Sequence, residues 1–109
     1  MSSIILYQSE TSEISIRVKA YFEDEKLIIE GYDIGSKVDE LLGDTDYEYS
    51  VTIFPDEVKK IYPFFHVKEN DKEELLKEIA GKFNTNSCFS EFKTYLDSNG
   101  INYESFSWV

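Results

Sequence analysis

The sequence predicts an α+β domain, in which two or three helices pack on one face of a mostly antiparallel sheet of four to five strands. Residues 12–22 alternate between apolar and polar, as in a half-buried strand. Residues 71–83 instead place apolar side chains at helical spacing. Strand-like segments dominate the first half of the chain, helix-like segments dominate the second half, and one strand-like segment closes it. This order is typical of an α+β domain.

The first half begins with three consecutive strands. Ile4–Tyr7 is a short apolar run, which we expect to be an edge strand or the start of a longer strand, and Gln8–Thr11 is expected to be a polar turn. Ser12–Phe22 is the most regular strand pattern in the chain. The charged turn Glu23–Lys26 leads to the third strand, Leu27–Ile34.

The hairpin formed by the second and third strands has a preferred register. With Phe22 opposite Leu27, apolar side chains face apolar side chains along one side of the hairpin. On the other side, Lys19 then comes opposite Glu30, which is a favourable pair of opposite charges. Both faces therefore favour this antiparallel pairing.

A short helix and a fourth strand follow. Ser36 and Asp39 resemble a capping box at the start of a helix over Lys37–Leu42, and Gly43 would end that helix. The next strand has two faces that alternate along residues 47–54. One face holds Tyr47, Tyr49, Val51 and Ile53, and the other holds Glu48, Ser50, Thr52 and Phe54.

The second half predicts three helices and a last strand. Pro55 suits the first turn of a helix that Pro63 ends. Asp71–Phe83 is a helix with a possible Asp71–Glu74 capping box, and a third helix starts at Asn86 or Ser87 and ends at the Asn99-Gly100 pair. Ile101–Val109 is expected to be a strand, and the change of its apolar face predicts a bulge near Glu104-Ser105.

Length and composition indicate one soluble domain spanning residues 1–109. A hydrophobic content of 41% and an aromatic content of 16% suffice for a core. No apolar run approaches the roughly 18 residues of a membrane span, and the N-terminal stretch lacks the basic start of a signal peptide. Cys88 is the single cysteine, which excludes an internal disulfide, so we expect a reducing compartment, the cytoplasm.

The charge balance limits the class of partner. The chain has 22 acidic and 11 basic residues and a formal net charge of -11. This balance argues against direct binding to nucleic acid phosphates and to anionic membranes, because both need a basic face. It is compatible with a basic protein partner, and equally with a charge that only keeps the protein in solution.

Motifs for catalysis or for a cofactor are absent from the sequence. Cys88 and His66 are both solitary, and Cys88 falls on the apolar side of a helix, which is typical of a structural thiol. Asp44–Glu48 resembles the start of a calcium loop, but an EF-hand needs Gly and Glu where Tyr49 and Pro55 stand. We therefore expect a protein that is not an enzyme and that has no cofactor and no defined metal site.

The strongest candidate for a binding surface is a group in which tyrosines alternate with acids. Tyrosine offers a large contact area with little loss of side-chain entropy, and acids complement a basic partner. The group consists of Tyr32, Asp33, Asp44, Asp46, Tyr47, Glu48 and Tyr49. The alternative is that these tyrosines belong to the core and the acids to a solvated rim.

Three sequence patterns together resemble those of a group of small acidic bacterial proteins of unknown function. They are Leu27-Ile-Ile-Glu-Gly-Tyr-Asp-Ile-Gly35, Gly43-Asp-Thr-Asp-Tyr-Glu-Tyr49, and Gly100-Ile-Asn-Tyr-Glu104 with Ser107-Trp108. This resemblance covers roughly residues 13–108 and implies no activity or site residue. In size and charge the chain is also similar to immunity proteins of bacterial toxin systems.

Our leading hypothesis is therefore a non-enzymatic, immunity- or inhibitor-like protein that binds a basic protein. One alternative is a domain that binds a small molecule or a divalent ion through Asp33 and the turn Gly43–Glu48, where Asp33, Asp44 and Asp46 could form a nonstandard ion site. Another is an acidic mimic of DNA. The sequence does not determine the oligomeric state.

Overall fold

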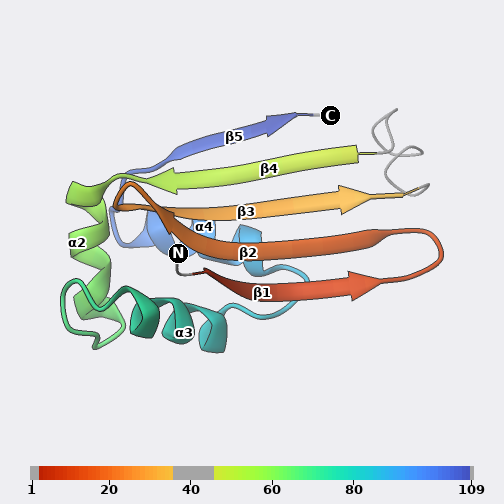
Figure 1. The fold of residues 1–109 in the computed structure, drawn as a ribbon. Coiled ribbons are helices and arrows are strands. Elements are labelled where there is room, and N and C mark those ends of the chain that lie inside the picture. The colour runs from red at the N-terminus through yellow and green to blue at the C-terminus, as the bar shows by residue number, and fades with distance from the viewer. Residues whose placement is uncertain (1–2, 36–45, 109) are drawn as a thin grey trace.

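The computed structural model describes residues 3–35 and 46–108, and it confirms the predicted α+β class (Figure 1). The described chain forms one antiparallel sheet of five strands and three helices. The elements are β1 (Ser3–Glu10), β2 (Ser15–Glu23), β3 (Lys26–Ile34), β4 (Asp46–Ile53), α2 (Pro55–Phe64), α3 (Lys72–Lys82), α4 (Cys88–Ser98) and β5 (Glu104–Trp108). The helix predicted over Lys37–Leu42, with its stop at Gly43, lies outside the described residues.

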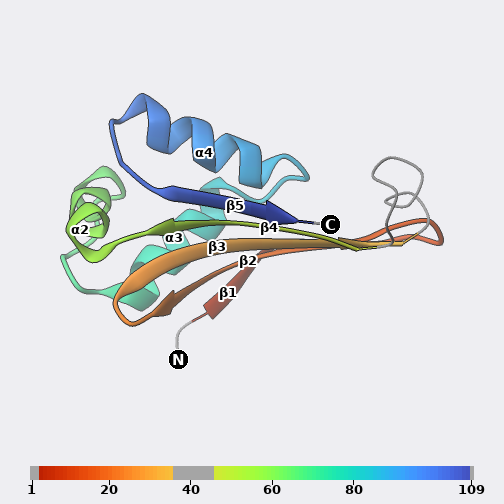
Figure 2. The same ribbon diagram turned by 90° about the horizontal axis from the view of Figure 1, so that it is seen from above.

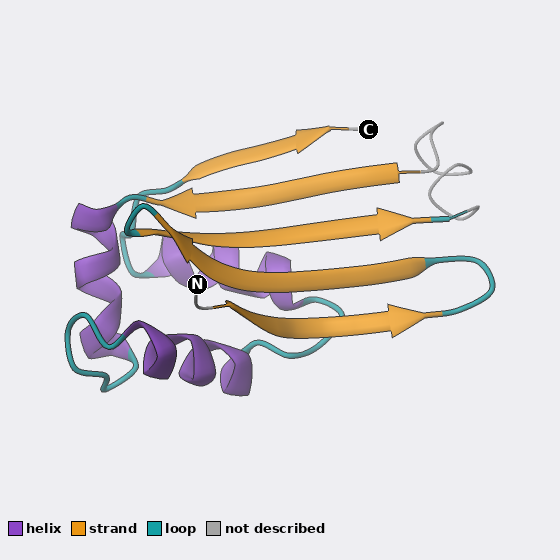
Figure 3. Ribbon diagram, viewed as in Figure 1, coloured by secondary structure: helices purple, strands orange, loops and turns teal. Residues whose placement is uncertain are grey.

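The strands lie in the sheet in the same order as in the chain, β1-β2-β3-β4-β5 (Figure 3). All three helices are inserted between β4 and β5, which are neighbours in space. The sequence did not decide whether the last strand is central or at an edge, and the structure places it at an edge beside β4. The helices lie on one side of the sheet, whereas the side toward the viewer in Figure 1 carries no described helix.

The predicted register of the β2–β3 hairpin is confirmed. Phe22 pairs with Leu27 and Lys19 pairs with Glu30. The ammonium of Lys19 lies 4.0 Å from the Glu30 carboxylate, at a solvent-exposed position. Such a surface pair contributes little stability. The register therefore depends mainly on burial of the apolar side chains on the helix side.

The predicted turn over Gln8–Thr11 is wrong, because β1 continues to Glu10 and pairs with β2 along its whole length. The turn lies later, where the Thr11 hydroxyl oxygen accepts hydrogen bonds from the backbone N–H groups of Glu13 and Ile14. Polar residues at the end of β1 are tolerated because this part of the sheet lies beyond the helices. A register shift between Ile5 and Tyr7 interrupts the β1–β2 pairing.

The predicted bulge in the last strand is also wrong. β5 starts at Glu104, and its pairing with β4 is regular from Thr52–Glu104 to Glu48–Trp108. The apolar face changes because Ile101 precedes the strand and is buried, while Phe106 points to the helix-free side and is 60% exposed. The bulge was predicted because Ile101, a core residue of the connection before β5, and Phe106, a surface residue of β5, were both assigned to one strand.

The helices start and end close to the predicted positions. α2 has Pro55 in its first turn and continues one residue past Pro63. The carboxylate of Asp71 accepts a hydrogen bond from the backbone N–H of Glu74 at the start of α3, as the capping pattern predicts. Ser87 precedes α4. Among the described residues, no helix is both long and apolar enough to span a membrane.

The core lies between the sheet and the helices. Its largest fully buried side chains come from β3, β4 and all three helices. They are Phe92, Leu27, Ile29, Ile53, Ile61, Leu75, Ile79, Leu96, Val51 and Cys88. Every one of the sheet residues in this set lies toward the end where α2 joins the sheet, so the core occupies only part of the sheet's length.

The opposite end of the sheet projects past the helices, as Figure 2 shows. We call this region the distal end and define it as residues 7–18, 31–34 and 46–49. Along the helix side of β3 and β4, burial decreases toward the distal end: Val51 and Ile53 outside it are fully buried, whereas Asp33 and Tyr47 inside it are half-buried. The distal end thus exposes parts of both faces of the sheet.

Candidate functional site

Six of the seven predicted binding residues lie together at the distal end, on β3 and β4. Residues on these strands pair directly: Tyr32 with Glu48, Asp33 with Tyr47, and Ile34 with Asp46. The seventh predicted residue, Asp44, lies outside the described residues. The predicted group is therefore continuous along the two strands.

This group nevertheless forms two surfaces, because successive residues of a strand point to opposite faces. The helix-side surface holds Asp33, Tyr47 and Tyr49, in line with the buried Val51 and Ile53. The helix-free surface holds Tyr32, Asp46 and Glu48. A single flat partner surface therefore cannot contact all six side chains.

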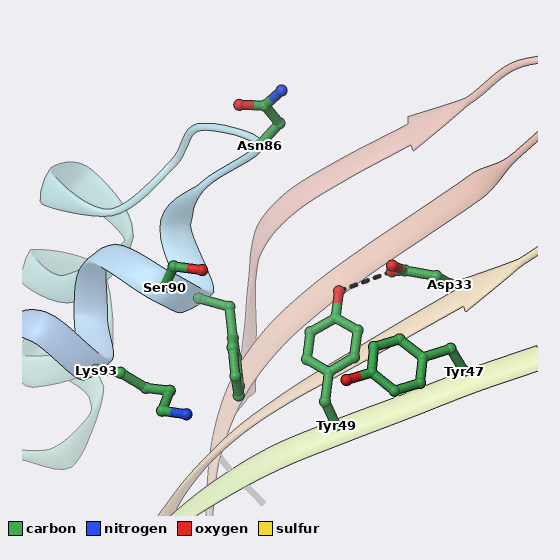
Figure 4. Close-up of a pocket in the computed structure, with 7 residues that line it drawn as sticks. Asp33, Tyr47, Tyr49, Asn86, Ser90 and Lys93 are labelled. Carbon is green, nitrogen blue, oxygen red and sulfur yellow. Dashed lines mark hydrogen bonds between the residues drawn. The ribbon is translucent and has the colours of Figure 1, made fainter. Parts of the chain in front are cut away.

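On the helix side, Tyr49 is the central side chain. Its hydroxyl donates a 2.7 Å hydrogen bond to the Asp33 carboxylate, which Figure 4 shows as a dashed line. Its ring packs edge-on against Phe89 of α4, with 4.7 Å between the ring centroids, and lies 5.2 Å from the ring of Tyr47. Tyr49 thus connects the sheet carboxylate to the first turn of α4.

Gly31 makes this position of the Tyr49 ring possible. The two residues are directly paired across β3 and β4. A Cβ atom on residue 31 would lie 1.8 Å from Cε2 of the Tyr49 ring, so the ring occupies the space that any other side chain would need. Gly31 therefore serves the close approach of an aromatic ring.

The surroundings change the acidity of both hydrogen-bonded groups. Burial raises the pKa of the Asp33 carboxyl, and the hydrogen bond from Tyr49 lowers it in part. Burial also raises the pKa of the Tyr49 hydroxyl, with further contributions from the hydrogen bond to Asp33 and from its charge. Tyr49 is thus held neutral as a donor, while the Asp33 charge is poorly solvated.

A cleft of about 360 Å³ opens beside this pair, between the sheet and the N-terminal part of α4 (Figure 4). Its lining consists of Asp33, Tyr47, Tyr49, Asn86, Phe89, Ser90 and Lys93. Four of these residues, from α4 and the turn before it, were not predicted from the sequence. Phe89 and Lys93 lie four residues apart at the margin of the buried stripe of Cys88, Phe92 and Leu96. That spacing is the sequence signal that could have placed them at a common surface.

The helix-free surface has a different character. It includes a cavity of about 430 Å³ lined by Ser15, Arg17, Lys19, Glu30, Tyr32, Ile34 and Glu48. Burial raises the pKa of Tyr32, together with the charge of Asp46, a hydrogen bond to Asp46, and the charge of Glu48. The lining of this cavity holds two acids and two bases, and the lining of the helix-side cleft holds one acid, one base and three aromatic rings.

The other chemical sites considered from the sequence do not form among the described residues. Cys88 is fully buried in the core, where burial raises the pKa of its thiol, while His66 is exposed in the turn after α2. Asp33 and Asp46 lie on opposite faces of the sheet, so they do not converge on one ion. No group of three His, Cys, Asp or Glu side chains in the described part of the chain could hold a metal ion.

Comparisons of the chain with models of protein families, with curated proteins and with solved structures found no match. The candidate site is therefore interpreted from its own geometry.

Proposed function

We propose that this protein is a non-enzymatic binding protein that recognises a basic protein partner through the distal end of its sheet. The observation that carries the proposal is that acidic side chains and tyrosines lie next to one another on β3 and β4, at the distal end of the sheet, which projects past the helices. The mechanism would be occlusion: the distal end covers the active or binding surface of the partner, as an inhibitor or immunity protein does.

The distribution of charge supports a basic partner. Among the described residues, the distal end holds five acids and one base, Arg17, whereas the rest holds 14 acids and nine bases. The acids of the distal end are Glu10, Glu13, Asp33, Asp46 and Glu48. Outside the distal end, ion pairs between described residues include Lys19–Glu30, Lys60–Glu57 and Lys72–Glu25. Acid clustering of this kind increases the rate of association with a basic surface and makes that rate sensitive to salt.

The aromatic side chains supply contact area next to these charges. Tyr32 and Tyr47 are half-buried on opposite faces, and Ile34 beside them is 38% exposed. Half-exposed tyrosines lose little entropy on binding, and they are enriched among the residues that dominate interface energies. Acids around tyrosines thus combine steering with anchoring.

Retention of partners from a lysate of the cells that make this protein would test the proposal. A basic protein should be retained at low salt and released at high salt. The double variant Asp46→Lys with Glu48→Lys should lower that retention at least about tenfold, because it reverses two distal charges. A matched control, Glu69→Lys with Glu78→Lys, changes the net charge equally at exposed positions outside the distal end.

Two results would contradict the proposal. One is the absence of any retained basic protein at either salt concentration. The other is an equal loss with the distal and the control variants, since the effect would then come from net charge and not from the distal end.

A second candidate function is binding of a small molecule, and the cleft of about 360 Å³ favours it. Its volume falls within the usual range of ligand pockets, roughly 300–1,000 Å³. A ligand that binds only the folded protein must raise its melting temperature. Thermal unfolding in the presence of small-metabolite mixtures would therefore separate this candidate from the first.

A further inference from the structure

We propose that the Asp33 end of the cleft binds an organic cation, namely the ammonium of a lysine or the guanidinium of an arginine from the partner. The inference rests on the proposed function, since it names the chemical group that the partner would insert. A free alkylamine or guanidine has the same chemistry, and the experiment below distinguishes the two sources.

The first argument is the carboxylate itself. Asp33 is half-buried on the helix side of β3, and its carboxylate accepts a 2.7 Å hydrogen bond from a neutral donor, the hydroxyl of Tyr49. A neutral donor does not cancel a negative charge. A cation that enters the cleft can form a charge-assisted hydrogen bond with this carboxylate in surroundings that are less polar than water.

The second argument is the set of aromatic rings around that carboxylate. Tyr47 and Phe89 line the same cleft, and the centroids of their rings lie 5.2 and 4.7 Å from that of Tyr49. Ring faces attract cations, and an anion gains nothing from them. Figure 4 shows Tyr47 and Tyr49 close to Asp33 on the sheet side of the cleft.

The third argument concerns Lys93, the cation that the described residues contribute to the lining of the cleft. Its ammonium lies 3.4 Å from the Ser105 hydroxyl on β5 and 5.9 Å from the centre of the Phe89 ring. Ser105 and Asp33 are two strands apart, and their partners on β4, Val51 and Tyr47, are four residues apart. With usual strand spacings, the Asp33 and Ser105 backbones are roughly 16 Å apart. Lys93 is therefore held toward the other end of the cleft, and no other basic residue among the described ones lines the Asp33 end, where we place a cation from outside.

A titration with ethylguanidinium chloride, followed by ¹H–¹⁵N NMR spectra, tests the site directly. We expect saturable shifts of the backbone amides of Gly31, Asp33, Tyr47 and Phe89. Asp33→Asn should weaken binding at least about tenfold, because it removes the charge and keeps an oxygen acceptor for Tyr49. Glu78→Gln is the matched control, since it removes one charge from an exposed position on α3 and should leave the affinity unchanged.

Three outcomes of this titration would overturn the inference. The first is shifts no larger than those caused by sodium chloride at the same ionic strength. The second is equal binding by the wild type and Asp33→Asn. The third is stronger binding of sodium acetate than of ethylguanidinium chloride at the same amides, which would make the cleft an anion site.

The same variants distinguish the source of the cation. If Asp33→Asn also lowers retention of the basic partner and Glu78→Gln does not, the cation comes from the partner. If ethylguanidinium binds at Asp33 but the partner is retained equally by both variants, the ligand is a free small cation and the lysine or arginine assignment is refuted. If neither ethylguanidinium binding nor retention depends on Asp33, the inference fails while the proposed function stands.

Discussion

Replacement of Gly31 by alanine should destabilise the protein by displacing the ring of Tyr49. The added Cβ would lie 1.8 Å from a ring carbon, so the ring must move. That movement breaks the 2.7 Å hydrogen bond to Asp33 and the edge contact with Phe89. A hydrogen bond to a charged group contributes about 1.5–3 kcal/mol, and an aromatic pair contributes about 0.5–1.5 kcal/mol.

The net effect is smaller than the sum of these contributions. Because the site is half-exposed, water replaces part of what is lost, and the low ends of both ranges apply, together about 2 kcal/mol. Alanine also restricts the unfolded chain more than glycine does, which raises the stability of the folded protein by about 0.5–1 kcal/mol. We therefore expect Gly31→Ala to lower the free energy of unfolding by about 1–1.5 kcal/mol, measured by urea unfolding with circular dichroism.

A double-mutant cycle identifies the cause. In a Tyr49→Ala background the ring is absent, so Gly31→Ala should raise stability by about 0.5–1 kcal/mol. Gly81→Ala is a control, because a Cβ there meets no atom within 4 Å and the residue lies in α3. It should stabilise by about the same amount in either background. An equal loss from Gly31→Ala with and without the Tyr49 ring would refute the reasoning.

Three further predictions concern single side chains. Burial raises the pKa of Asp33 above 3.8, so the stability that its protonated form confers is present below pH 3.8 and is lost as pH rises through the folded-state pKa. At pH 7, Asp33→Asn should therefore melt at or above the wild-type temperature, with a difference that disappears near pH 3; a large loss at pH 7 would contradict this. Phe92 is fully buried and packs edge-on against Phe83, so Phe92→Ala should cost about 3–5 kcal/mol in urea unfolding, while the exposed Thr94→Ala should change stability by less than about 0.5 kcal/mol. Burial raises the pKa of Tyr21 to about 12, and the charge of Glu30 and a hydrogen bond to Glu30 contribute to this shift. The stability that the neutral Tyr21 hydroxyl contributes is therefore intact below pH 10 and is lost as pH approaches 12. The difference in absorbance at 295 nm between the wild type and Tyr21→Phe should titrate near pH 12, and a midpoint near 10 would be inconsistent with this environment.

Local patterns were sufficient for the parts of the fold that depend on neighbouring residues in the chain. The register of β2 and β3 could be predicted because a short charged turn joins two strands whose apolar sides must coincide. The cap of α3 could be predicted because Asp71 and the Glu74 amide are three residues apart. The end of β1 was misjudged because polar residues there pair with β2 beyond the helices, where burial no longer distinguishes strand from turn.

The candidate site was predicted only in part. Alternation along β3 and β4 placed the acids and tyrosines, but Asp33 and Tyr49 meet across 16 residues of sequence, and that pairing depends on the register of β3 with β4. The helix side of the cleft depends on where α4 crosses the sheet. The spacing of Phe89 and Lys93 is the only feature of the sequence that indicates their place in the cleft. Such contacts between distant segments follow from packing and not from local pattern.

The two edges of the sheet also differ in how they resist self-association. The edge formed by β1 has a register shift and contacts α3, and both features hinder pairing with another strand. The outer edge of β5 pairs with no described strand, and its sequence Ser-Phe-Ser-Trp after Glu104 contains no charge. The net charge of -11 opposes the close approach of the edges of two copies. The acidity that would attract a basic partner thus also opposes pairing between the sheets of two copies, and this opposition weakens when acid or salt reduces the repulsion.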